Sequence, residues 1–277
     1  MEALKRGDSI PELPEVETIS RSLQINLGAR ITKIDIKCAG VIRRRDFEPE
    51  EICGSTISSI NRKGKFLNFI FENGLELIIH MGMSGRFYMV HEDEEILAPH
   101  VHVIIHLDNK KGLVYQDARR FGGLWLIRDS RGFFSRLGRE PLSDEFTAEY
   151  LARKVKKRRQ AIKALLLNQS IVCGIGNIYA DEALFEAAIR PDRPAGSLSA
   201  SEIGCLCKAI KEVMQNSIQK RGTTFRDFRD GYNKSGGFQD YLKVYGKTDQ
   251  DCSRCGGIIK RKKIGGRSTH FCDKCQK

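Results

Sequence analysis

The sequence predicts an α+β protein in which an N-terminal antiparallel β-sandwich with a leading helix precedes a helical domain and a C-terminal finger held by cysteines. Three patterns support this prediction. Apolar residues alternate with a period of two over residues 31–130, they follow helical spacing over most of residues 141–220, and two Cys-x-x-Cys pairs close the chain. A chain of 277 residues suits two domains, or one domain with appendages. We place the domain boundaries at residues 11–140, 141–240 and 241–277.

The composition points to a polyanionic partner. The chain carries 47 Lys and Arg residues against 35 acids, a formal charge of +12, which favours nucleic acid ahead of a membrane surface. Residues 1–10 lack an apolar segment, and no run of about eighteen apolar residues occurs, which excludes a signal peptide and a membrane-spanning helix. The cysteines outside the two pairs are scattered and expected to be reduced, so we expect a cytoplasmic protein.

The first half is expected to be mostly strand after one helix. Apolar residues follow helical spacing from Val16 to Leu27, and Gly28 suits the cap of that helix. The pattern then becomes that of β-strands, with a tight hairpin turn at residues 72–74. The expected strands are residues 31–37, 56–61, 65–71, 75–81, 87–90, 101–107, 113–116 and 124–127.

Residues 11–17 read PELPEVE, and Pro11 allows two interpretations. Proline and acidic residues favour the first turn of a helix. A proline that begins a chain is instead a secondary amine, which titrates near about pH 8 and can attack an electrophilic carbon at neutral pH. Glu12 would then move protons at the reacting centre. Ten residues precede Pro11, and an amide there would abolish this chemistry, so we expect translation to begin at the Ile10 codon and the initiator to be removed.

Two glycine-bounded turns in this half suit contact with DNA. Residues 80–85 read HMGMSG, where Met83 is either core filler or, on a turn, a wedge between base pairs. Residues 117–123 read DARRFGG, which places Arg119 and Phe121 ahead of a Gly-Gly turn. In a DNA-reading loop, the cations would meet phosphate or the orphaned base, and the ring would insert into the base stack.

Other polar residues of the sandwich have open roles. Lys65 begins an expected strand, where a lysine is as often a solvated edge residue. His100 and His102 flank Val101 at the start of another strand, and alternation predicts that they share a face. A structural role for these histidines is as plausible as a DNA contact.

The helical region contains a basic run. Residues 143–159 are expected to form a helix that ends with five cations in residues 154–159, including Arg158. Such runs are often plain solvated faces, but here they also suit the release of counterions from DNA. Residues 198–220 are expected to form a long amphipathic helix that serves as scaffold. Residues 222–239 contain too few apolar residues to be expected to pack against the rest of the protein.

Two further helices, residues 161–168 and 178–188, flank a Gly-Ile-Gly sequence at residues 174–176. A dinucleotide-binding turn is rejected, because a helix precedes the glycines and the third glycine is absent. We expect instead that backbone N–H groups at the helix start approach a phosphate, with Asn177 as a further donor.

The end of the chain has metal-ligand spacing. Sixteen residues separate two Cys-x-x-Cys pairs, which is the spacing of a zinc ribbon. Four thiolates close the coordination shell, so the expected metal is one structural Zn2+ rather than a catalytic ion. A pair of disulfides is the alternative. The expected ligands are Cys252, Cys255, Cys272 and Cys275.

These motifs together resemble the bacterial formamidopyrimidine-DNA glycosylase family, from PELPEVET through the Arg-Arg-Phe loop and GIGNIYA (residues 174–180) to the finger. The resemblance implies a helix–two-turn–helix in the helical domain and a bifunctional DNA glycosylase and abasic-site lyase of base excision repair, acting on 8-oxoguanine and formamidopyrimidines. It also implies damaged double-stranded DNA as the partner, no membrane, no nucleotide cofactor, and a monomer associated with the bacterial nucleoid. Residues 222–239 would be a mobile lid, disordered without DNA.

The resemblance assigns roles residue by residue. Pro11 would attack C1′ of the damaged nucleotide and Glu12 would donate a proton, with Lys65 and Arg267 assisting at the phosphates. The residues that would fill the gap left by the extruded base are Met83, Arg119 and Phe121, and the other DNA contacts would be His100, Lys163 and Asn177, to which the basic run adds Arg158. Two alternatives are an endonuclease VIII-type glycosylase for oxidised pyrimidines and, if Pro11 stays blocked, a non-catalytic damaged-DNA binding protein.

Overall fold

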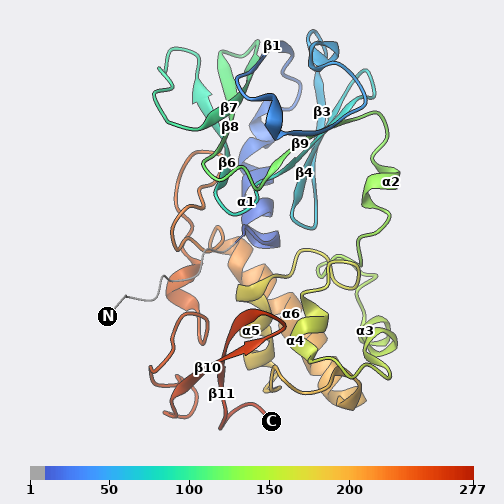
Figure 1. The fold of residues 1–277 in the computed structure, drawn as a ribbon, viewed down its shortest axis with the longest axis vertical. Coiled ribbons are helices and arrows are strands. Elements are labelled where there is room, and N and C mark those ends of the chain that lie inside the picture. The colour runs from blue at the N-terminus through green and yellow to red at the C-terminus, as the bar shows by residue number, and fades with distance from the viewer. Residues whose placement is uncertain (1–9) are drawn as a thin grey trace. The chain divides into compact units, whose positions relative to one another are not determined.

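The computed structural model describes residues 10–277, so the expected leader lies outside the described residues except for Ile10. The chain forms two compact units (Figure 1). One contains Ile10–Arg136 together with Lys220–Gly237, and the other contains Leu137–Gln219 together with Phe238–Lys277. The helical region and the finger therefore share one unit, and the expected lid segment, except its last two residues, belongs to the unit of the sandwich.

Helix α1 (Leu13–Leu23) opens the first unit. Pro14 lies in its first turn, and the side chains of Glu12 and Glu15 cap that turn reciprocally, which satisfies N–H groups that a helix start leaves unpaired. The helix is shorter than expected because a 3-10 turn, η1 (Gln24–Asn26), follows it. Gly28 then adopts a φ of +79°, the left-handed conformation that suits glycine.

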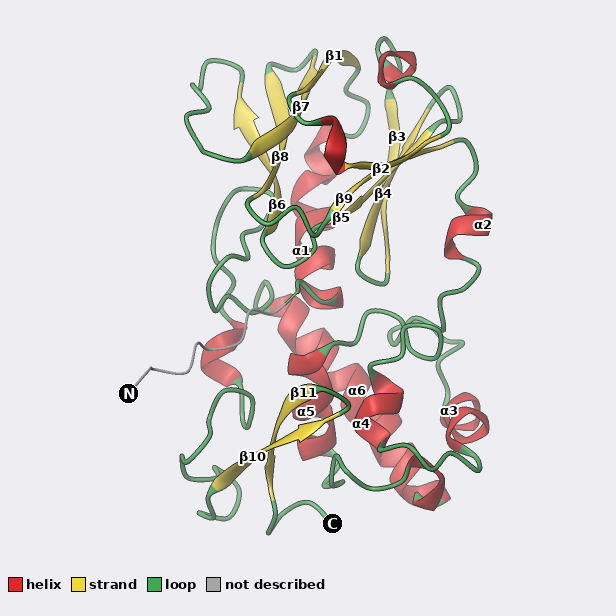
Figure 2. Cartoon of the chain, in the orientation of Figure 1, coloured by secondary structure: helices red, strands yellow, loops and turns green. Residues whose placement is uncertain are grey.

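Two sheets form the sandwich, in the orders β1-β7-β8-β6 and β2-β9-β5-β4-β3. Helix α1 contacts β6 of the first sheet and β3 and β4 of the second, and Figure 2 shows it alongside both. The strands are β1 (Ile31–Ile36), β2 (Ile42–Arg45), β3 (Ile57–Lys63), β4 (Phe66–Phe71), β5 (Glu76–His80), β6 (Gly85–His91), β7 (Val101–Leu107), β8 (Lys111–Asp117) and β9 (Gly123–Ile127).

Strand β2 is not predicted by the sequence, because three consecutive arginines interrupt any apolar alternation. It pairs in parallel with β9, whereas the other strand pairs of the described sandwich are antiparallel. The expected hairpin at residues 72–74 is confirmed between β4 and β5, where Gly74 has a φ of +79°.

The segment Lys220–Gly237 packs on this sandwich, so the expectation that it cannot pack is wrong. Phe228 is 7% exposed and joins the core cluster that α1 and both sheets form. The N–H of Met89 on the edge strand β6 donates to the carbonyl of Gly231 at 2.8 Å. An aromatic anchor and an edge-strand hydrogen bond are thus among the contacts that hold this mostly polar segment on the sandwich.

In the second unit, α5 (Asn177–Glu186) is buried along nearly its whole length, and α6 (Ala200–Gln219) and α4 (Ile162–Leu166) pack against it. Helix α3 (Ala148–Val155) contacts α6 and is shorter than expected, because the chain turns at Lys157 with a φ of +61°. The finger is a hairpin of β10 (Ile259–Ile264) and β11 (Arg267–Cys272), and β11 lies beside α5.

The remaining elements are short. Helix α2 (Arg131–Phe134) belongs to the first unit, and the other 3-10 turns are η2 (Ala39–Val41), η3 (Pro49–Ile52), η4 (Ala195–Ser197) and η5 (Phe238–Tyr241). Among residues 10–277, no helix combines the length and the apolar composition that crossing a membrane requires.

Candidate active site and nucleic-acid interface

The start of α1 holds Pro11 and Glu12 in a buried turn. The Glu12 side chain is 2% exposed, and its backbone N–H donates to Glu15 Oε2 at 2.9 Å. The other Glu15 oxygen accepts the N–H of Thr223 at 2.6 Å. One buried carboxylate therefore fixes both the turn behind Pro11 and the segment Lys220–Gly237. Sequence reasoning misses this role of Glu15, because its second partner lies 208 residues away.

The turn between β3 and β4 brings Lys65 close to His80. Gly64, with a φ of +57°, makes the turn, and Lys65 is half-buried. Burial and the nearby Lys65 ammonium lower the pKa of His80 from 6.5 to about 4. His80 Nδ1 accepts the N–H of Gly82 at 3.1 Å, so the neutral ring carries its proton on Nε2. His80, which the sequence did not single out, is thus a neutral donor beside the Met83 turn.

This shift predicts a pH-dependent stability. Because the folded pKa lies below 6.5, the unfolded state binds more protons between pH 4 and 6.5, and stability should rise with pH across that window. Across the whole window, the titration of His80 should change the free energy of unfolding by about 3 kcal/mol. Urea unfolding of the wild type and His80→Gln at about pH 4.5 and about pH 7 measures it. The pH-dependent difference should shrink in the variant, and an unchanged difference would contradict the assignment.

Asp117 ties the two glycine-bounded turns together. Its carboxylate is fully buried and accepts hydrogen bonds from Ser84 Oγ at 2.5 Å, the Gly122 N–H at 2.9 Å and the Tyr115 hydroxyl at 3.2 Å. The turns touch so closely that a Cβ at Gly82 would lie 2.3 Å from the Gly122 nitrogen. Glycine is therefore required there, and a buried acid fixes one turn against the other.

The same turns carry the expected wedge residues. Met83 is half-buried, whereas the Phe121 ring is 62% exposed and lies 5.8 Å from the Arg119 guanidinium. The Arg119 guanidinium is also 4.0 Å from the Asp227 carboxylate. Behind the loop, the Arg43 guanidinium donates to the carbonyls of Arg120 at 2.5 Å and Gly122 at 2.7 Å. The structure thus brings Met83, Arg119 and Phe121 together on a supported surface.

His100 and His102 do not share a face, so that prediction is wrong. His100 precedes β7 with a φ of +64°, where the alternation of a strand does not apply, and its side chain is exposed. His102 is 8% exposed, and its Nε2 lies 2.8 Å from the carbonyl of Asp117. Of the two histidines, only His100 has an exposed side chain.

Lys163 is not the DNA-facing cation that the resemblance implied. Its side chain is 0% exposed, and Nζ lies 2.6 Å from Asp181 Oδ1. The same nitrogen donates to Thr269 Oγ1 at 2.8 Å and to the Ser268 carbonyl at 3.0 Å. Helical spacing places Lys163 on α4 but does not show that the finger covers that face of the helix.

Of the other expected contacts of this unit, Arg158 is exposed and Asn177 is half-buried. Arg158 lies in an exposed run after α3. Asn177 is the first residue of α5, and its Nδ2 donates to the Tyr245 hydroxyl at 3.5 Å. Glu182, not singled out by the sequence, accepts the N–H groups of residues 243–245 at 2.8–2.9 Å, while burial raises its pKa.

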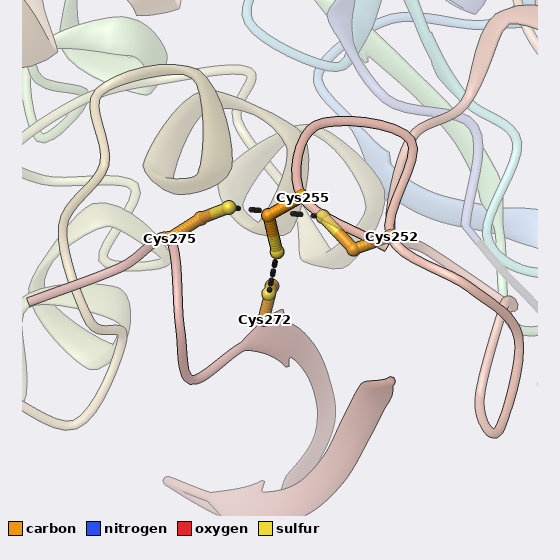
Figure 3. Close-up of side chains that lie close together, drawn as sticks. All are labelled: Cys252, Cys255, Cys272 and Cys275. Carbon is orange, nitrogen blue, oxygen red and sulfur yellow. Dashed lines mark hydrogen bonds between the residues drawn. The ribbon is translucent and has the colours of Figure 1, made fainter. Parts of the chain in front are cut away.

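The four finger cysteines form a metal site (Figure 3). Their sulfur atoms all lie within 4.8 Å of one another, with Cys252–Cys275 at 3.8 Å and Cys255–Cys272 at 3.6 Å. Tetrahedral zinc with Zn–S bonds of about 2.3 Å separates its sulfurs by about 3.8 Å, so the donor set fits. These separations are far longer than the S–S bond of about 2.05 Å that the disulfide alternative requires.

Arg267 stands at the opposite end of the finger. It begins β11 after the turn residues Gly265 and Gly266, both with positive φ, and its side chain is exposed. Lys260 and Lys262 of β10 pair with Asp273 and Asp192.

Comparison with known families now identifies the fold. The model described as "Formamidopyrimidine-DNA glycosylase N-terminal domain" matches residues 10–124, and "Formamidopyrimidine-DNA glycosylase H2TH domain" matches residues 137–229. The chain belongs to the formamidopyrimidine-DNA glycosylase family. A third model, "Zinc finger found in FPG and IleRS", matches residues 250–277, so the four-cysteine site is the zinc finger of this family and holds one structural zinc ion.

Relatives of this family match over nearly their whole length. The formamidopyrimidine-DNA glycosylase of Syntrophomonas wolfei is 57% identical over 267 residues, which cover 96% of this chain and all of that protein. The Lactococcus lactis Fpg (MutM) bound to DNA containing N7-benzyl-Fapy-dG has a TM-score of 0.90 at 36% identity, covering 96% of this chain and 100% of that one. MutM of Thermus thermophilus has a TM-score of 0.86 at 39% identity, covering 96% and 98%. The expected glycosylase fold, with its helix–two-turn–helix, is confirmed.

Proposed function

We propose that this chain excises oxidised purines from duplex DNA with the nitrogen of Pro11 as nucleophile, and then cleaves the abasic strand. A glycosylase with abasic-site lyase activity is the established activity of the family to which the chain belongs. Solved relatives from Lactococcus lactis contain DNA with Fapy-dG and DNA with an abasic site. The observation that carries the mechanism is the buried, reciprocally capped turn that places Pro11 and Glu12 together at the start of α1.

The chemistry requires Pro11 to be the first residue, as a secondary amine. Its nitrogen lone pair forms a bond to C1′ while the glycosidic C–N bond breaks, and the base leaves with the electron pair and a proton. Glu12 donates a proton to the ring oxygen O4′, so the sugar opens and the C1′–N bond becomes an iminium. Loss of a C2′ proton then breaks the C3′–O bond, a second elimination breaks the C5′–O bond, and water releases the enzyme.

Extrusion of the damaged nucleotide is assigned to the two supported turns. Flipping a base costs a few kcal/mol of lost stacking, and inserted side chains offset that cost. Met83 and Phe121 supply the apolar wedge, and Arg119 supplies a cation for the unpaired base. Asp117 and Arg43 hold these turns in shape before DNA arrives.

Both units carry polar or basic side chains for the phosphates. Lys65 and His100 belong to the first unit, and Arg158, Asn177 and Arg267 to the second. Lys163 is left out of this set because it is buried. In a plot of the logarithm of the binding constant against the logarithm of the salt concentration, each neutralised phosphate should make the slope more negative by about 0.9.

Strand-nicking assays test the substrate class. Duplexes with 8-oxoguanine or formamidopyrimidine should be cut faster than a thymine glycol duplex of the same sequence. Faster cutting of thymine glycol would favour the oxidised-pyrimidine alternative, for which a Lactococcus lactis complex with oxidised pyrimidine DNA gives a reason. Binding without cutting by a chain that starts at Pro11 would support the non-catalytic alternative.

The wedge makes a separate prediction. Phe121→Ala should slow excision of 8-oxoguanine by about 10- to 100-fold, because unstacking is no longer offset, and should slow cleavage of a preformed abasic site less. Single-turnover rates on both duplexes measure the difference. Leu97→Ala, which truncates a side chain 79% exposed in the same unit, is the matched control. Equal losses on both duplexes would argue against a wedge.

A further inference from the structure

The buried cation Lys163 lies in a polar network that ends at the finger arginine. From α4, its Nζ donates to the Ser268 carbonyl and to Thr269 Oγ1. The Thr269 hydroxyl in turn donates to the Arg267 carbonyl at 3.3 Å. The ammonium is therefore two hydrogen bonds from the backbone of Arg267, although Arg267 lies on a different element.

Asp181 of α5 completes the network. Its Oδ1 pairs with Lys163, and its Oδ2 accepts the backbone N–H of His270 at 2.8 Å and lies 3.1 Å from His270 Nδ1. Lys163 and Asp181 are both 0% exposed in their side chains. The three residues that follow Arg267 are thus held by one charged group from each of two helices.

Apolar contact supports the same end of the hairpin. A Cβ at Gly265 would lie 3.3 Å from the Cβ of Ala164, the neighbour of Lys163 on α4. The glycine turn therefore rests on the helix that supplies the ammonium.

The zinc site does not replace this support. Cys272 stands five residues along β11 from Arg267, a distance of about 17 Å at the rise of an antiparallel strand. A two-stranded hairpin is only marginally stable alone, so a metal at one end leaves the other end free to bend. The ion pair lies near the end that the metal leaves free.

We propose that Lys163 and Asp181 are positioning residues that fix the backbone of β11 so that the exposed Arg267 guanidinium meets the DNA phosphates in one orientation. The inference rests on the role proposed for Arg267. It also gives a reason for the buried pair, because ion pairs in a protein interior contribute little net stability once their desolvation is counted and are better suited to specifying one arrangement. Lys163 affects the reaction through Arg267 and does not touch DNA.

The test is a double-mutant cycle with two readouts. Lys163→Met, Asp181→Asn and the doubly neutral Lys163→Met/Asp181→Asn are each made with Arg267 intact and with Arg267→Ala, in chains that begin at Pro11. Affinity and single-turnover cleavage of an 8-oxoguanine duplex, the urea midpoint and the zinc content are measured. Lys208→Met, which breaks an exposed pair with Glu212 in the same unit, is the control.

With Arg267 present, Lys163→Met should lose between about tenfold and 100-fold in cleavage, because displacement of a positioned group by about 1 Å has effects of that size. With Arg267→Ala the same substitution should cause no further loss, whereas its effect on the urea midpoint should be the same in both backgrounds. Zinc content should stay at one per chain. If the single variant fails to fold, the doubly neutral variant, which leaves no unpaired buried charge, carries the comparison.

Two results overturn the inference in distinguishable ways. Losses of cleavage that are fully additive with Arg267→Ala would show that the pair supports the scaffold without positioning Arg267. Full activity of Arg267→Ala alone would refute the proposed role of Arg267, and the positioning role with it.

Discussion

A chain that begins at Pro11 should form a covalent adduct with an abasic duplex when borohydride is present, and the chain that keeps residues 1–10 should not. The reason is chemical: an internal proline nitrogen is a tertiary amide without an available lone pair, whereas a terminal one is a secondary amine. We expect cleavage of 8-oxoguanine duplexes to fall by at least about 10³-fold in the longer chain, the size of effect that a lost catalytic group produces. Gel electrophoresis detects the trapped adduct, and the intact mass of each protein shows which residue begins the chain.

In the same assay, the Glu12→Gln variant distinguishes the role of the nucleophile, Pro11, from that of the proton donor, Glu12. The amide keeps an oxygen that can accept the capping hydrogen bond of the helix start, so the turn should survive. On an 8-oxoguanine duplex, ring opening and the strand cleavage that follows it should fail without a proton for O4′, but trapping on a preformed abasic site should persist, because that sugar already opens to an aldehyde. An adduct formed by the longer chain with its leader intact would show that Pro11 is not the nucleophile.

The sequence predicts those parts of the site whose chemistry is local. Two Cys-x-x-Cys pairs bring their own ligands together, and glycines around Met83 and Phe121 make their own turns, so spacing alone identifies them. The helix start at Pro14 is likewise specified by residues that are adjacent in the sequence. These features can be predicted without knowledge of contacts between residues that are distant in the sequence.

The sequence fails where a distant segment decides the environment. Lys163 reads as a surface cation in the sequence, and only its contact with Ser268, 105 residues away, shows that it is buried. Phe228 belongs to a segment too polar to predict as packed, yet it reaches the sandwich core. Strand β2 is fixed by pairing with β9 rather than by its own arginines. In each case tertiary packing overrides local propensity.

After the loss of the Pro11 amine, removal of zinc is expected to have the next largest effect, on the affinity for DNA. Binding of a structural zinc ion supplies about 10–16 kcal/mol in small four-ligand sites, far more than a short hairpin gains from its own packing. Chelation, or Cys272→Ser, should therefore unfold residues 250–277 and remove Arg267 and the basic strand β10 from the DNA surface. We expect the affinity for an 8-oxoguanine duplex to fall by at least about 100-fold at moderate salt, because several phosphate contacts are lost together.

Metal analysis and fluorescence anisotropy test this prediction, with Cys205→Ser as the matched control. Cys205 is an exposed thiol on α6 of the same unit and lies outside the four-sulfur cluster, so its loss should leave zinc at one per chain and binding unchanged. The start of α1 belongs to the other unit, which contains no zinc ligand. Borohydride trapping at high protein concentration should therefore recover in part after chelation. Zinc-free protein that binds the duplex as tightly as the holoprotein would show that the finger does not contribute to the interface.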